Sequence, residues 1–235
     1  MTTIQWMPTN IQLSEDGFAN DIIYFEPEPA YSYYKKLSEG TEYLQCPAFT
    51  AYLRNTFVLK SPYDITFSFN KEEKTAHTDS FDQAFFDANI HVKQSGTSAP
   101  MVVSFFPRYV FISESKQPII LTMSPMLFNA KQGVVPGTFD MTKWVRPVEM
   151  AIEISNPDTP MEFKRGEGVC MVKFEPADGS VATLERGVLT QDVVKLAKAC
   201  VDTKKTCPGI NLKKAYEMAD GYITIMKKRI FKSIE

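Results

Sequence analysis

Residues that build metal centres and disulfide frameworks are scarce in this sequence. It contains four cysteines and two histidines in 235 residues, and no two cysteines have the Cys-x-x-Cys spacing of a structural zinc site. The histidines, His77 and His91, do not complete a ligand set with any cysteine. We therefore expect no metal site and no cofactor. Cys170 lies in an apolar, strand-like run and is expected to pack as a small hydrophobe.

Long apolar runs and a strong excess of one charge are also missing. No run of about 18 apolar residues occurs, and the N-terminus lacks a basic segment followed by an apolar one, so we expect neither a membrane span nor a secretory signal peptide. The formal net charge of −2 provides no general attraction to phosphate, so nucleic acid is not an expected partner. An apolar content of 44% with 23% charged residues is typical of a globular, cytoplasmic protein.

Turn residues and the spacing of apolar residues divide the chain into three parts. Residues 1–54 are rich in proline and aromatic side chains and are expected to form an arm packed on the core. Residues 55–180 contain short β-branched and aromatic runs between turn signals, as in an all-β core domain. Residues 181–235 should form a helical extension, with Thr190 and Asn211 as candidate N-caps. The sequence thus predicts a mainly β fold with C-terminal helices.

Individual elements follow from the same patterns. Near-alternation between Asn55 and Phe69 predicts two short strands joined by a bend at Ser61-Pro62, and Lys71–His77 reads as a polar hairpin tip. Further strand-like runs occur at Ile90–Val92, Met101–Phe106, Tyr109–Ile112 and Ile119–Met123.

The last helical stretch is predicted to dock through one apolar stripe. Its lysines, Lys213, Lys214, Lys227 and Lys228, are expected to lie away from that stripe. The stripe comprises Leu212, Ala215, Tyr216, Ala219, Ile223, Met226 and Ile230.

A regular alternation also runs through residues 144–155, which predicts a strand. Its apolar positions are Val148, Met150, Ile152 and Ile154. Glu149 and Glu153 fall on the opposite face, about 13 Å apart along the strand, too far to share one proton. They would cooperate only across a concave site.

Residues 148–174, VEMAIEISNPDTPMEFKRGEGVCMVKF, contain an alternating strand, a turn, a short strand, a basic–glycine corner and a last strand. Upstream of them, Gly137–Asp140 forms a Gly-Thr-Phe-Asp turn, and Ser61–Ile65 reads Ser-Pro-Tyr-Asp-Ile. This order resembles the dUTP pyrophosphatase and dCTP deaminase family over about residues 55–176. The resemblance implies a β-clip core, with Asp140 near the sugar and the catalytic water. It also implies a homo-oligomer, commonly a trimer with sites between subunits.

Several phosphate-binding groups of that family are replaced in this chain. Ser124 falls at the family's phosphate-binding serine, but Met123 stands where an arginine usually precedes it. Met171 takes the place of a glutamine in the last strand, and a thioether cannot donate that hydrogen bond. Each lost charge-assisted donor removes about 1.5–3 kcal/mol of binding free energy. Lys143 and Arg146 are the candidate substitutes around phosphate.

These observations support three hypotheses about function. The first is a non-catalytic structural or interaction module that retains a β-clip scaffold and binds protein partners or itself. The second is a deoxynucleotide-processing enzyme, a pyrophosphatase or deaminase, that uses Asp140 with Glu149 or Glu153 as a second acid–base group; magnesium is expected only in that case. The third is a protein whose basic C-terminal helix contacts nucleic acid or an acidic host factor.

A second resemblance concerns the source of the chain. Cys46–Phe49 and Asn55–Pro62 are similar to segments of uncharacterised proteins from tailed bacteriophages. The resemblance implies a viral protein in the host cytoplasm or in the virion, and it implies no activity.

Overall fold

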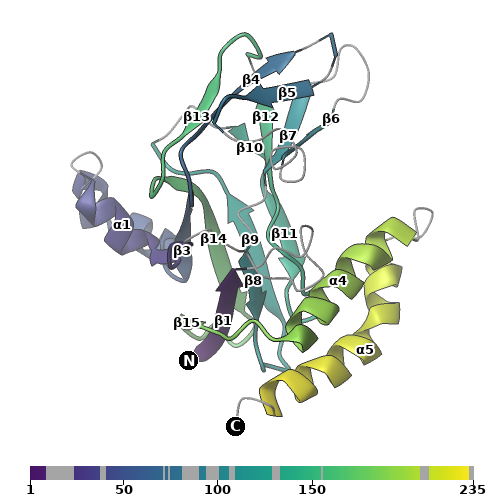
Figure 1. Ribbon diagram of the computed structural model, residues 1–235. Helices are drawn as coiled ribbons and strands as arrows, with labels where there is room; N and C mark the ends of the chain where they lie inside the picture. Colours follow the sequence, from purple (N-terminus) through teal and green to yellow (C-terminus); the bar gives the residue numbers. More distant parts are fainter. Residues whose placement is uncertain are drawn as a thin grey trace.

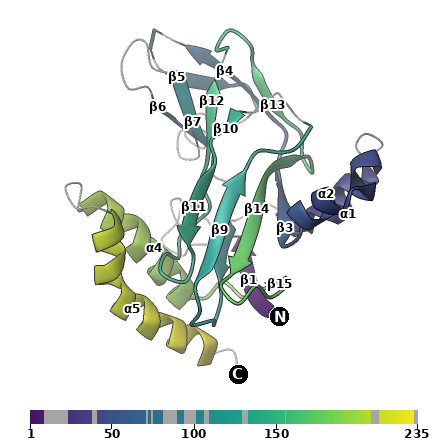
Figure 2. The same cartoon turned by 180° about the vertical axis from the view of Figure 1, so that it is seen from behind.

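The computed structural model describes residues 1–8, 24–37, 41–70, 72–73, 75–80, 90–93, 101–105, 109–128, 133–154, 156–206 and 212–232. A body of β-sheets carries two helical units on opposite sides (Figures 1 and 2). One unit follows β2 and contains α1 (Ala30–Lys36), η1 (Thr41–Gln45) and α2 (Pro47–Tyr52). The other contains α4 (Gln191–Thr206) and α5 (Leu212–Lys232). The prediction of a mainly β chain with C-terminal helices is confirmed.

A five-stranded sheet with β14 at its centre organises the body. Its order is β11-β9-β14-β3-β2, with β2 (Glu28–Pro29), β3 (Thr56–Lys60), β9 (Ile119–Ser124), β11 (Gly137–Asp140) and β14 (Gly168–Pro176). The first five residues of β14, Gly168–Val172, are all buried without alternation, and Lys173 is the first residue that is not. A strand covered on both faces needs apolar residues at every position, which accounts for this continuous run.

Three smaller sheets complete the body. Two of them occupy the end of the body remote from both chain termini (Figure 1). The first has the order β13-β4-β5, with β4 (Ile65–Asn70), β5 (Thr75–Thr78) and β13 (Met161–Phe163). The second has the order β10-β12-β7-β6, with β6 (Ile90–Lys93), β7 (Met101–Phe105), β10 (Gly133–Val134) and β12 (Met150–Ile154). The third has the order β15-β1-β8, with β1 (Thr2–Pro8), β8 (Tyr109–Ile112) and β15 (Ala182–Arg186).

The third sheet joins segments from the two outer parts of the chain. Residues Thr2–Pro8, expected in the arm, form β1, and Ala182–Arg186, expected in the helical extension, form β15 parallel to it. Ile4 and Trp6 of β1 are buried in the main core. The β body therefore includes both segments as well as most of residues 55–180.

Most strand predictions are confirmed, with one correction. The expected strands near residues 56–69, 90–92, 101–106, 109–112 and 119–123 are β3, β4, β6, β7, β8 and β9, although Phe106 lies outside the described residues. The polar tip is shorter than predicted, because Thr75–His77 belongs to β5, and Lys71 is also outside the described residues.

The predicted strand over residues 144–155 was wrong in its first half, because β12 begins only at Met150. Pro147 lacks a backbone donor and forms just an isolated bridge with Val110. The buried alternation at Val148, Met150, Ile152 and Ile154 is confirmed. Glu149 precedes the strand and does not share a strand face with Glu153.

The C-terminal helices pack on the body through a second hydrophobic cluster. The Oγ1 of Thr190 accepts a hydrogen bond from the backbone N–H of Val193 at 3.4 Å, as expected of an N-cap. The stripe of α5 is confirmed at Ile223, Met226 and Ile230, which are buried against α4 and the body. Asn211 and the side chains of Leu212, Lys213, Ala215 and Tyr216 lie outside the described residues.

Membrane-spanning helices were searched for among the described residues. None of those helices combines the length and the apolar character needed to cross a bilayer.

The cysteines give a direct test of this packing. Cys170 and Cys200 are buried, which raises their thiol pKa to about 12 and about 11, whereas Cys46 is exposed. At pH 8 the thiolate fraction of Cys170 is on the order of 1 in 10⁴, and thiolate is the reactive form. We predict that iodoacetamide labels Cys46 in the native protein, and Cys170 and Cys200 only after unfolding. Peptide mass spectrometry reads this out; native labelling of Cys170 at the rate of Cys46 would contradict it.

Candidate functional site

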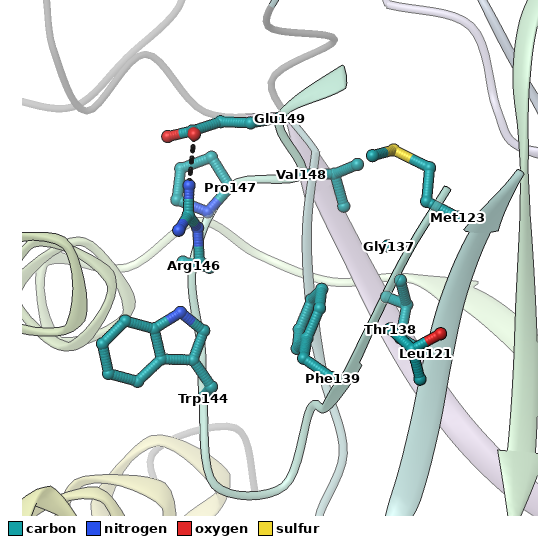
Figure 3. Close-up of a pocket in the computed structure, with 10 residues that line it drawn as sticks. All are labelled: Leu121, Met123, Gly137, Thr138, Phe139, Trp144, Arg146, Pro147, Val148 and Glu149. Atoms are coloured by element: carbon teal, nitrogen blue, oxygen red, sulfur yellow. Dashed lines mark ion pairs between the residues drawn. The ribbon is translucent and has the colours of Figure 1, made fainter. Parts of the chain in front are cut away.

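A pocket lies between the β9–β11 hairpin and the irregular segment that precedes β12. Its volume is about 250 Å³. Its walls are mainly apolar, and the lining residues are Leu121, Met123, Gly137, Thr138, Phe139, Trp144, Arg146, Pro147, Val148 and Glu149 (Figure 3). The register of the hairpin, with Gly137 opposite Met123 and Phe139 opposite Leu121, brings these side chains to one wall.

One ion pair supplies the charged groups of the pocket. The guanidinium of Arg146 pairs with the carboxylate of Glu149, and both side chains are largely covered, with 14% and 28% of their surface exposed. Phe139 and Trp144 lie below the pair (Figure 3). An anionic ligand would have to compete with Glu149 for Arg146. The pocket therefore combines apolar walls with a cation that is already neutralised.

The six residues predicted to act in catalysis or phosphate binding occupy separate places. Arg146 and Glu149 meet in the pocket, as just described. Ser124 ends β9 and alternates away from Leu121 and Met123, so it lies on the opposite face from the pocket wall.

Of the remaining three, Asp140 and Lys143 share one turn, in which the backbone N–H of Lys143 donates a hydrogen bond to the Asp140 carbonyl at 3.2 Å. Asp140 pairs with Ile120, four residues along β9 from Ser124, which corresponds to about 13 Å. The side chain of Lys143 is exposed, and Glu153 is exposed on β12 opposite Gly133. Among these six side chains, the ion pair described is that of Arg146 and Glu149.

Asp140 makes local contacts at the end of β11. Its Oδ1 accepts hydrogen bonds from the backbone N–H and the hydroxyl of Thr142, at 3.0 and 2.6 Å. Lys227 of α5 lies close enough for an electrostatic interaction with this carboxylate. Burial between the helices and the body lowers the pKa of Lys227 to about 8, although Asp140 favours its charged form. Lys227 was predicted to lie away from the apolar stripe together with Lys214 and Lys228; those two are exposed, whereas Lys227 is partly covered.

A second site lies on the face of the sheet that carries Ser124. Met171 of β14 is the direct cross-strand partner of Ser124, so the two positions that the family resemblance assigns to phosphate binding are adjacent. Met171 is fully buried, because α1 of the arm packs over it. The Tyr34 hydroxyl donates a hydrogen bond to the Met171 sulfur at 3.5 Å and accepts one from the backbone N–H of Leu127 at 2.8 Å.

Further contacts hold the arm in this position. The Tyr33 hydroxyl accepts a hydrogen bond from the backbone N–H of Gly168 at 3.0 Å. A Cβ atom at Gly168 would lie 2.8 Å from Cγ1 of Val58 and 2.7 Å from Cε of Met126, so any larger residue would require these side chains to shift. Lys60 Nζ lies 2.5 Å from the Glu28 carboxylate. Although burial opposes it, hydrogen bonds from Lys36 and Lys60 lower the pKa of Glu28.

The sequence analysis did not identify Tyr33, Tyr34 or Lys227 as members of a site. The tyrosines were seen only as part of an aromatic arm, and Lys227 only as one lysine of a basic helix. No local sequence pattern marks these three residues, because each interacts with a residue more than 80 positions away in the chain.

No family model, no curated protein and no solved structure matches this chain. The family resemblance stated above therefore remains a hypothesis, and the argument for function depends on the geometry alone.

The buried lysine predicts an unusual pH dependence of stability. Because the pKa of Lys227 is about 8 in the folded chain and 10.5 as a free side chain, the unfolded chain binds more protons between these values. The free energy of unfolding should therefore rise with pH there. We expect Lys227→Met to be more stable than the parent at pH 7, with the difference shrinking by about 1–2 kcal/mol at pH 9.5.

Urea denaturation at the two pH values measures this difference. The exposed neighbour Lys228 provides the control, since Lys228→Met should change stability equally at both. A parent and a Lys227→Met protein whose difference is independent of pH would contradict the prediction.

Proposed function

We propose that this chain is a non-catalytic structural or interaction protein of a virus, built on a β-clip core. The observation that carries the proposal is the burial of Met171 beneath α1. In the family resemblance, Ser124 and the residue at position 171 would face a triphosphate. Here Tyr33 and Tyr34 of the same chain cover that part of the sheet, and the Met171 sulfur is already hydrogen-bonded.

The energetics disfavour opening this contact for a ligand. Tyr34 is fully buried, and burial raises its pKa to about 12. Exposing Tyr34 and Met171 again costs about 1.5–3 kcal/mol for each side chain. A phosphate would then meet a thioether, which has no proton to donate. The arm therefore replaces a binding site with a packed contact.

Two residues of the arm, Tyr43 and Phe49, lie beside Phe128, which follows β9. We name these three side chains the arm surface and propose it as an interaction surface. The rings of Tyr43 and Phe128 stack with centroids 4.9 Å apart, although 54% of Tyr43 and 53% of Phe128 remain exposed. Exposed aromatic clusters of this kind are characteristic of protein–protein contacts.

The backbone at Phe128 strengthens this interpretation. Its φ angle of 63° lies in the left-handed region, which is unfavourable for a bulky residue. Such strain persists mainly where the position of the side chain matters for function. An exposed ring held at this cost is best explained by contact with a partner protein that offers an apolar surface.

A second candidate function is favoured by the pocket. It adjoins Gly137–Asp140, which the sequence predicted as a turn but which forms strand β11. The resemblance would place a sugar there, and the pocket also contains Arg146. In the enzymatic alternative, Asp140 acts as the base, and Glu149, Glu153, Ser124 and Lys143 contribute from their separate positions only if copies of the chain assemble around a shared site.

A nucleotide assay separates the two candidates. We expect dUTP, dCTP and the other deoxynucleoside triphosphates, each with and without Mg²⁺, to leave the melting temperature unchanged, because a ligand must bind the native state to raise it. We also expect no release of pyrophosphate or ammonia. Turnover that is lost in Asp140→Asn while the fold is retained would establish the enzymatic alternative and reject the proposal.

The arm surface is tested by comparing two aromatic positions. Phe128→Gly suits the positive φ angle and removes the ring, so we expect unchanged or higher stability together with loss of a stoichiometric partner protein in affinity purification from the virus-producing host. Tyr31→Ser removes a ring of similar exposure, 43%, outside the arm surface and should retain the partner. Retention of the same partner by Phe128→Gly, or no partner for the parent protein, would contradict the proposed surface.

A further inference from the structure

The helix α5 has a second apolar stripe besides the one that packs on the body. Met218, Tyr222 and Ile225 are 68%, 46% and 67% exposed. Their spacing of four and then three residues is that of a coiled-coil seam. At about 100° per residue the three side chains fall within an arc of about 60°. The helix packs on α4 and the body through Ile223, Met226 and Ile230. The stripe lies on another side of the helix, at the outer side of the α4–α5 pair (Figures 1 and 2), where none of the described residues covers it.

A glycine interrupts the helix beside the stripe. Gly221 is exposed, and a Cβ atom there would meet nothing within 4 Å. The fold of a single copy therefore gives no steric reason for glycine at this position, where it weakens the helix relative to alanine. A glycine in a helix interior is explained when another backbone or a bulky side chain approaches closely.

We propose that the stripe pairs with the same stripe of a second copy of this chain, with the two α5 helices antiparallel. A two-fold axis between Gly221 and Tyr222 places Gly221 of each copy opposite Tyr222 of the other. Each tyrosine ring then fills the space that the missing side chain leaves open. The same axis sets Met218 opposite Ile225, so the stripe is complementary to itself, as a two-fold interface requires.

The charges beside the stripe agree with this pairing. Glu217 and Lys228 are both exposed on the flank that carries Gly221. Antiparallel helices bring Glu217 of one copy near Lys228 of the other, twice per pair. At the two ends Lys214 faces Arg229, whose charge is already paired with Asp192 of α4 at 2.9 Å, so the repulsion between these exposed cations is small. The formal charge of −2 adds no strong repulsion between copies.

The area of the contact determines its strength. Three apolar side chains per copy bury less surface than a standard stable interface. The pair is therefore a concentration-dependent dimer. This inference goes beyond the proposed function and does not depend on it, since the arm surface and α5 lie on opposite sides of the body (Figure 1).

Sedimentation velocity over a range of concentrations tests the association. We expect the weight-average mass of the full chain to rise from 26.6 kDa toward twice that value, and Ile225→Glu to remain monomeric throughout. A parent protein that stays monomeric would overturn the proposal. So would a trimer, or a dimer that Ile225→Glu leaves intact.

Gly221 provides a variant whose two effects have opposite signs. Gly221→Ala should raise the melting temperature of the monomer by a few degrees, because alanine favours the helix. The same variant should weaken dimerisation at least tenfold, because the new methyl group occupies the space of the tyrosine ring. Thr224→Ala, an exposed position away from the stripe, should leave the dimerisation constant unchanged. An unchanged constant for Gly221→Ala would overturn the proposed packing.

Disulfide trapping tests the antiparallel orientation. Met218→Cys and Ile225→Cys are made separately in a chain whose Cys46 and Cys207 are replaced by serine. The mixture should cross-link under mild oxidation. Each variant alone should not, because its two cysteines lie seven residues apart along the pair, about 10 Å, which exceeds the reach of a disulfide. Equal cross-linking of a single variant would show parallel helices and overturn the orientation.

Discussion

The structure depends on one strand that is buried on both faces. Gly168–Pro176, β14, pairs with β3 on one side and β9 on the other, and its residues alternate between two different environments. Cys170, Val172 and Phe174 belong to the main core, whereas Met171 belongs to the cluster beneath the arm. Because β14 needs cover on both faces, the arm is a structural requirement of the sheet. The arm therefore closes this face of β14.

The charged groups are likewise paired within the chain. Arg146 is neutralised by Glu149, Asp140 is hydrogen-bonded within its own turn, and Glu28 of the arm is paired with two lysines. Groups satisfied in this way stabilise local geometry and are poorly placed to exchange protons with a substrate. Some apolar side chains behave in the opposite way: Tyr43 and Phe128 of the arm surface and the stripe of α5 are exposed among the described residues. This contrast agrees with the proposal that the chain acts through contacts with other proteins.

Prediction from sequence succeeded where the signal was local. Alternation located β3, β4 and β9, and the helical spacing of Ile223, Met226 and Ile230 identified the buried side of α5. It failed at residues 144–149, where Pro147 interrupts an otherwise regular alternation. It also did not assign β1 and β15 to the body, since two strands almost 180 residues apart can be recognised as neighbours only when they pair. For the candidate site, the sequence pointed to Arg146 and Glu149 but not to the tyrosines that cover Met171.

Local chemistry alone set the strand and helix periods, the Thr190 cap and the absence of metal-site spacing in the sequence. These properties depend on neighbours within a few residues, so the sequence alone determines them. Tertiary structure decided which segment covers Met171, which carboxylate reaches Arg146 and how deeply Lys227 is buried. Some of these contacts join residues that are distant in the chain, and the others are set by packing. Which residues meet depends on how the whole fold packs, so no single segment of sequence determines it.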